Sequence, residues 1–101
     1  MRVKILDTAP GSGPARGTYL EARIRRVFEP FSARITAVEL ELEHVGVLHE
    51  GRLVVRIRGG APLMFSTKGR RMTNVLANLI DVAGERLLAA FPSGRVREAA
   101  S

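Results

Sequence analysis

The side chains of this 101-residue sequence best suited to binding a ligand are arginines, which make up fourteen of its sixteen basic residues. Arg23 and Arg26 follow Tyr19 at helical spacing, so the three are expected on one side of a helix. A guanidinium can pair bidentately with a phosphate and stack on a base. Tyr19 could stack as well. These residues are one candidate RNA-binding group; an ordinary solvated face is the equal alternative.

A second basic group contains Lys68, Arg70 and Arg71, where a strand is expected to give way to a helix. Backbone N–H groups at that helix start would add to the attraction for a phosphate. The group also lies in the basic half of the chain. Residues 1–50 carry seven basic and seven acidic side chains, and residues 51–101 carry nine and three, so the whole net charge of +6 arises there. A polyanionic partner is favoured, although arginine codon bias in a GC-rich genome is an open alternative.

Other chemistry finds little support in the sequence. His44 and His49, with Glu43 and Glu50, form the one candidate metal or acid–base cluster, but their spacing across an expected turn matches no standard ligand set. We therefore predict no metal site and no cofactor. The glycine-rich segment 11–17 lacks the Gly-Lys-Ser/Thr ending of a P-loop. No nucleophile, base and orienting group can be assembled, so we expect a protein that is not an enzyme and has no small-molecule substrate.

Length and composition fit a single globular domain, with 46% hydrophobic and 26% charged residues. We expect residues 1–92 to form this domain and residues 93–101 to form a short flexible tail. The absence of cysteine excludes disulfides and is compatible with a reducing compartment. No apolar run is long enough to span a bilayer, and the N-terminus does not resemble a signal peptide. A cytoplasmic protein without a membrane partner is expected.

The first half of the chain predicts a strand, a loop, a helix and a second strand. Arg2–Leu6 alternates basic and apolar residues, as a half-buried strand does. Residues 8–17 are rich in Pro and Gly and predict a loop, in which Arg16 is expected to be mobile or, alternatively, to clamp a phosphate. Thr18 and Glu21 form a capping-box pair that predicts the helix start, and Pro30 predicts its end. Alternation of Val, Leu and Glu over residues 38–43 then predicts a strand.

The second half predicts a turn over residues 45–51, two further strands and a long helix. Residues 52–58 alternate arginine with apolar side chains, and Gly59 and Gly60 are expected to form a hairpin turn with positive φ angles. Residues 63–67 predict a strand, which Pro62 places at a sheet edge. Apolar residues at helical spacing over 72–91 predict an amphipathic helix that ends at Pro92.

This order, β-α-β-β-β-α, predicts an α+β fold in which a four-stranded sheet carries both helices on one face. The first helix would be a right-handed crossover between parallel strands. On the open face, Glu39, Glu41 and Glu43 would lie between Arg2 and Lys4 on one neighbouring strand and Arg56 and Arg58 on the other. Such exposed pairs specify register and neutralise each other. The uncompensated charge would then lie on the helix side.

The sequence resembles the ribosome hibernation-promoting factor family, also described as ribosome-associated inhibitors or subunit-interface proteins, in its short type. The resemblance rests on the element order, on Phe-Ser-Ala-Arg-Ile at 31–35, on Arg-Gly-Gly at 58–60, and on Thr-Lys-Gly-Arg-Arg-Met at 67–72 before a helix containing Leu-Ile-Asp at 79–81. It covers nearly the whole chain.

The resemblance implies a shape similar to double-stranded RNA-binding domains. It also implies binding to the small ribosomal subunit and its rRNA, in the channel for mRNA and tRNA, where the protein keeps ribosomes idle under stress. A monomer is expected. Arg86, the one basic residue of segment 72–91, joins the two basic groups as a candidate rRNA contact.

Two alternatives stay open. Because the last helix carries so few basic residues, the chain could be a protein-interaction or oligomerisation module that shares the fold and has lost rRNA binding. A general double-stranded RNA binder is a weaker possibility.

Overall fold

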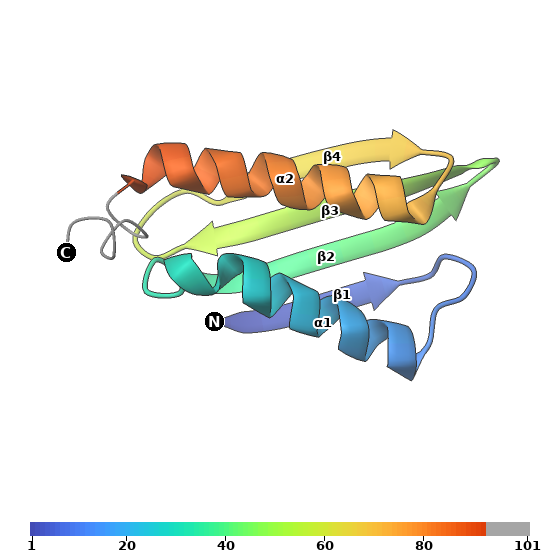
Figure 1. Ribbon diagram of the computed structural model, residues 1–101, viewed down its shortest axis with the longest axis horizontal. Coiled ribbons are helices and arrows are strands. Elements are labelled where there is room, and N and C mark those ends of the chain that lie inside the picture. Colours follow the sequence, from blue (N-terminus) through green and yellow to red (C-terminus); the bar gives the residue numbers. More distant parts are fainter. Residues whose placement is uncertain (93–101) are drawn as a thin grey trace.

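A computed structural model describes residues 1–92 as one α+β domain with the predicted element order (Figure 1). Its elements are β1 (Arg2–Asp7), α1 (Pro14–Phe28), a short 3₁₀ turn (Glu29–Phe31), β2 (Ile35–Val45), β3 (Leu48–Ile57), β4 (Leu63–Gly69) and α2 (Met72–Ala90). The predicted tail, residues 93–101, lies outside the described residues.

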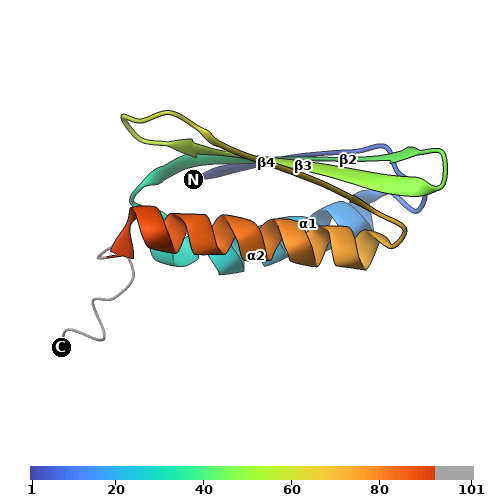
Figure 2. The same cartoon turned by 90° about the horizontal axis from the view of Figure 1, so that it is seen from above.

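The four strands form one sheet in the order β1-β2-β3-β4. β1 pairs with β2 in parallel, and the other two pairings are antiparallel. Both helices cover one face of the sheet and leave the other face open, as predicted (Figure 2). β4 is an edge strand, in agreement with the prediction from Pro62.

The hydrophobic core lies between the helices and the sheet because the apolar stripe of each helix meets the apolar face of the strands. Its buried side chains include Leu20, Ile24 and Phe28 of α1, Val38, Leu40 and Leu42 of β2, Leu53 and Val55 of β3, and Val75, Leu79, Ala83 and Leu87 of α2. These are the positions that the sequence periodicity predicts.

The start of α1 differs from the prediction. The helix begins at Pro14, one turn before the expected Thr18, and no side chain caps it. Proline is favoured in the first turn because its missing N–H would have no intrahelical partner there. Thr18 consequently lies inside the helix, so the predicted capping box with Glu21 was wrong.

The early helix start brings Arg16 onto α1, where it is held in place. Its Nε and Nη2 donate to the two carboxylate oxygens of Asp7 at 2.6 and 2.7 Å, and its Nη1 donates to the Pro10 carbonyl at 2.8 Å. The hydrogen bonds that Arg16 donates to Asp7 are the main reason that the pKa of Arg16 is raised, against the opposing effect of burial. Arg16 is therefore a fixed structural residue, and the prediction of a mobile one was wrong.

The β2–β3 hairpin is tighter and longer than predicted. Its strands are joined by Gly46 and Val47 alone, with Gly46 at φ 64°, so the expected turn over residues 45–51 is mostly strand. A positive φ at the first turn position fits a type II′ hairpin. Gly51 lies buried within β3.

The β3–β4 connection is a five-residue loop rather than a two-residue turn, and only Gly59 of the predicted glycine pair has a positive φ.

The open face of the sheet carries only part of the predicted ladder of opposite charges. Glutamates of β2 pair with arginines of β3, whereas Arg2 and Lys4 of β1 form no ion pair within residues 1–92. Arg56 Nε lies 2.9 Å from a carboxylate oxygen of Glu39. Arg52, rather than the expected Arg58, reaches Glu41 at 3.1 Å and Glu43 at 3.6 Å. Arg58 follows the end of β3 and so cannot take part in the ladder.

Candidate nucleic-acid interface

Tyr19, Arg23 and Arg26 lie together along one flank of α1. Leu20 and Ile24 are buried in the core, so the helical repeat places these three side chains beside the buried stripe rather than within it. Together with Ala22 and Val27 they line a surface hollow of about 400 Å³. We refer to Tyr19, Arg23 and Arg26 as the α1 stripe.

The phenol of Tyr19 is available for stacking. The residue is 58% exposed, which is unusual for a large aromatic side chain and excludes a place in the core. Arg23 Nη1 donates to its hydroxyl oxygen at 3.2 Å. Among residues 1–92, no carboxylate lies within ion-pair distance of Arg23 or Arg26, so both charges are uncompensated by a direct partner.

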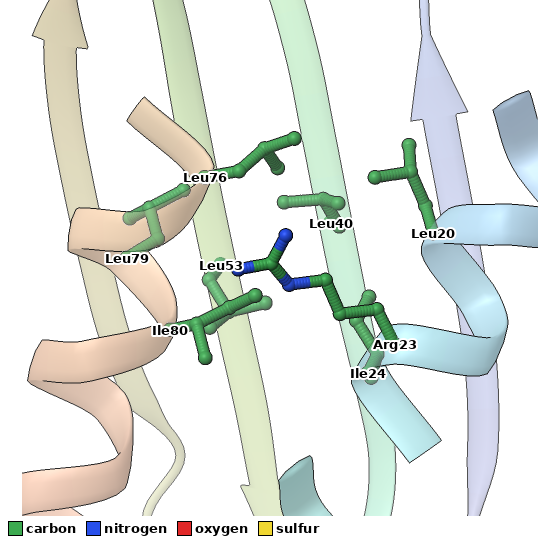
Figure 3. A pocket seen from close by; sticks show the side chains of 8 residues that line it. All are labelled: Leu20, Arg23, Ile24, Leu40, Leu53, Leu76, Leu79 and Ile80. Atoms are coloured by element: carbon green, nitrogen blue, oxygen red, sulfur yellow. The ribbon is translucent and has the colours of Figure 1, made fainter. Parts of the chain in front are cut away.

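Arg23 also borders the gap between the two helices (Figure 3). The gap is lined by Leu20 and Ile24 of α1, Leu40 and Leu53 of the sheet, and Leu76, Leu79 and Ile80 of α2. Its cavity of about 10 Å³ is too small for more than a water molecule. The guanidinium of Arg23 reaches over these apolar side chains, which fixes its position without neutralising it.

The second basic group divides between the two faces of the molecule. β4 extends to Gly69, so Lys68 is a strand residue and does not lie in the turn as predicted. Its Nζ lies 3.5 Å from Glu50 on the open face of the sheet. Arg70 and Arg71 are exposed in the connection to α2, and no ion pair with another described residue neutralises them.

Arg71 is the residue that immediately precedes α2, and no side chain caps that helix start. The first N–H groups of any helix lack intrahelical acceptors, and here no capping side chain supplies one. Both these groups and the two arginine side chains attract anions, so this corner of the molecule keeps the electrostatic character that the sequence predicts.

Arg86 lies apart from both groups. Its guanidinium carbon is 5.9 Å from the centre of the Phe65 ring, which places it at the β4 edge of α2. On the side toward α1, α2 instead presents Leu76 and Ile80. The described structure thus brings together three of the seven predicted site residues, keeps Arg70 and Arg71 at the start of α2, and separates Lys68 and Arg86 from them.

Sequence comparison gives no family assignment, since no protein-family model and no curated protein matches the sequence. Comparison of structures does find related folds. A ribosomal subunit interface protein from Coxiella burnetii superposes with a TM-score of 0.75 at 13% identity, over 89% of this chain and 97% of that one. The N-terminal domain of Protein Y from Thermus thermophilus gives 0.72 at 14% identity, over 86% and 96%.

These similarities extend over nearly the whole of both structures, so the chain has the fold of ribosomal subunit interface proteins. The resemblance noted in the sequence is thereby confirmed at the level of the fold. In addition, no helix within residues 1–92 is both long and apolar enough to cross a membrane.

Proposed function

We propose that this protein is a ribosome-associated translation inhibitor. In this proposal it binds the small ribosomal subunit in the mRNA–tRNA channel and keeps ribosomes idle under stress. The observation that carries the proposal is the near-complete structural match to a ribosomal subunit interface protein. In this proposal the protein acts in the cytoplasm as a monomer and needs no cofactor. It inhibits translation by occupying a site on the ribosome and not by catalysis.

The helix side of the molecule is the proposed rRNA contact. Arg23 and Arg26 would neutralise phosphates, while exposed Tyr19 would stack on an unpaired base. Arg70 and Arg71, with the first N–H groups of α2, would hold another segment of the backbone. The open face is a poor second choice because Glu39, Glu41 and Glu43 already pair with its arginines.

The proposal predicts that the protein sediments with 30S subunits on sucrose gradients at low salt and dissociates at high salt. Arg26→Ala should weaken binding and make the slope of log affinity against log salt shallower by about 1, the value of one phosphate contact. Arg25→Ala is the matched control, since Arg25 lies on the same helix but turns toward Glu21 and the Met1 carbonyl.

Two results would contradict this prediction. The first is a wild-type protein that stays at the top of the gradient at both salt concentrations, even in lysate from starved cells. The second is equal loss of affinity in the two variants. If the α1 stripe is the docking surface, Arg26, which belongs to it, must contribute more to affinity than Arg25, which does not.

Arg86 favours the second candidate function, a protein-interaction or oligomerisation module. It is the one basic residue of α2, and it packs on Phe65 away from the α1 stripe. A stable complex with another protein, combined with no salt-dependent RNA binding, would select this candidate.

A further inference from the structure

His44 and His49 face each other across the β2–β3 hairpin. The register pairs them directly, and directly opposite residues of an antiparallel pair have Cβ atoms about 5 Å apart. Their ring centres are 4.7 Å apart, with an angle of 60° between the ring planes. The two-residue turn at Gly46 and Val47 lies only one residue pair away, so the positions of both histidines are fixed by a short, well-defined hairpin.

The two rings lie on the helix-facing side of the sheet. They occupy the next position of the alternation after the pair formed by Leu42 and Gly51. His49 is partly buried, and its Nδ1 is inaccessible to solvent and has no hydrogen-bond partner. His44 is exposed. The pair therefore has one dry side and one side open to solvent, and at least one nitrogen still lacks a partner.

This spacing suits a shared metal ion. A metal that lies about 2.0 Å from one nitrogen of each ring holds the two ring centres roughly 5 Å apart, close to the 4.7 Å that separates these rings. Nitrogen from neutral imidazole is a ligand that Zn²⁺, Ni²⁺ and Cu²⁺ accept readily.

The surrounding charges restrict which ions can bind. Glu43 precedes His44 and Glu50 follows His49, so both glutamates project from the opposite face of the sheet. There Glu43 approaches Arg52, and Glu50 approaches Lys68. Within residues 1–92, no group of three or more potential ligands is assembled. The attraction must therefore come from metal–nitrogen bonds and not from a negative field, which disfavours Mg²⁺ and Ca²⁺ because these ions require several oxygen ligands.

We propose that His44 and His49 chelate one transition-metal ion of the Zn²⁺, Ni²⁺ and Cu²⁺ class, with water as the remaining ligands. None of the proposed rRNA-binding side chains is a ligand of this site, although His49 pairs with Gly69, the residue before Arg70. Metal binding to the isolated protein can therefore be tested separately from ribosome binding.

The test is calorimetric titration of the untagged full chain with Cu²⁺, Zn²⁺ and Mg²⁺. We expect saturable binding of one ion per chain for Cu²⁺ and Zn²⁺, tighter for Cu²⁺, and none for Mg²⁺. His44→Asn and His49→Asn should each abolish it. Glu43→Gln and Glu50→Gln, on the opposite face, are controls that should retain it. In NMR spectra, Zn²⁺ should shift amide signals only around the hairpin tip.

Because His44 is exposed, His44→Asn should fold normally, as circular dichroism can verify, and its result remains interpretable even if His49→Asn is unstable. The proposal is overturned by the absence of saturable Cu²⁺ or Zn²⁺ binding, by binding that survives His44→Asn, or by a stoichiometry of one ion per two chains.

Discussion

Asp7 and Arg16 join the end of β1 to the first turn of α1 through two short hydrogen bonds. The Asp7 carboxylate is only 9% exposed and also accepts from the Ala9 N–H at 3.1 Å. Water therefore screens this pair less than a surface ion pair. The pair closes the Pro- and Gly-rich segment that the sequence predicts to be a loop.

We expect Arg16→Ala to lower the free energy of unfolding by about 1.5–3 kcal/mol, the range for a lost hydrogen bond to a charged group. Arg25→Ala removes an exposed pair with Glu21 and should cost a few tenths of a kcal/mol. Urea unfolding of both variants measures the difference. Equal stabilities would show that the loop is held by other contacts.

Glu39 and Arg56 provide a second residue-scale prediction, on pH. The hydrogen bond from Arg56 is the main cause that lowers the pKa of Glu39 below its ordinary value of 4.5. A carboxyl group whose pKa is lower in the folded state stabilises the fold above its unfolded pKa, and this contribution disappears as pH falls through the folded pKa.

Glu39→Gln should therefore be less stable than the wild type at neutral pH, and the difference should shrink as the pH falls through the lowered pKa of Glu39. Urea midpoints measured from pH 7 to pH 3 test this. A difference that is constant over this range would mean that the substitution acts through packing rather than charge.

At the scale of the elements, Gly51 determines how closely α2 approaches the sheet. A Cβ atom at this position would lie 2.7 Å from Leu79 Cδ1 and 2.8 Å from Val75 Cγ1. The valine is β-branched and has little rotamer freedom in a helix. A side chain at residue 51 would thus force the helix away from β3.

Gly51→Ala should destabilise the fold by about 1–3 kcal/mol, as overpacking of a core does. Gly84 is the matched control because a Cβ added there meets no atom within 4 Å; Gly84→Ala should stabilise α2 by about 0.5–1 kcal/mol. Thermal unfolding followed by circular dichroism compares them. A Gly51→Ala variant with unchanged stability would contradict the close approach of α2 to β3.

The same elements indicate what the sequence could and could not predict. Element order, core positions and the α1 stripe depend on periodicity within a single helix or strand, and they were predicted. The structural roles of Gly51 and Lys68 depend on neighbours that are distant in sequence. Gly51 resembles a turn residue in the sequence, but in the fold α2 packs on it. Lys68 lies in a strand because β4 pairs with β3. The contact between His44 and His49 was missed for the same reason. Their symmetric placement about Gly46 and Val47 was the available signal.

At the scale of the whole molecule, the two faces of the domain differ in how their charges are used. On the open face, arginines pair with glutamates across the strands. On the helix side, Arg23, Arg26 and the two arginines before α2 have no such partners among the described residues. Within residues 1–92, the positive charge without an ion-pair partner is therefore presented mainly by the helix side.

The direction of the helices adds to this asymmetry. Since β1 and β4 run the same way and each is followed by a helix that returns along the sheet, α1 and α2 point in the same direction (Figure 1). Their macrodipoles consequently add instead of cancelling, with both positive ends at the edge of the molecule that carries Arg70 and Arg71. Such a permanent dipole orients the protein before contact, so that this edge leads when the protein diffuses toward a polyanion.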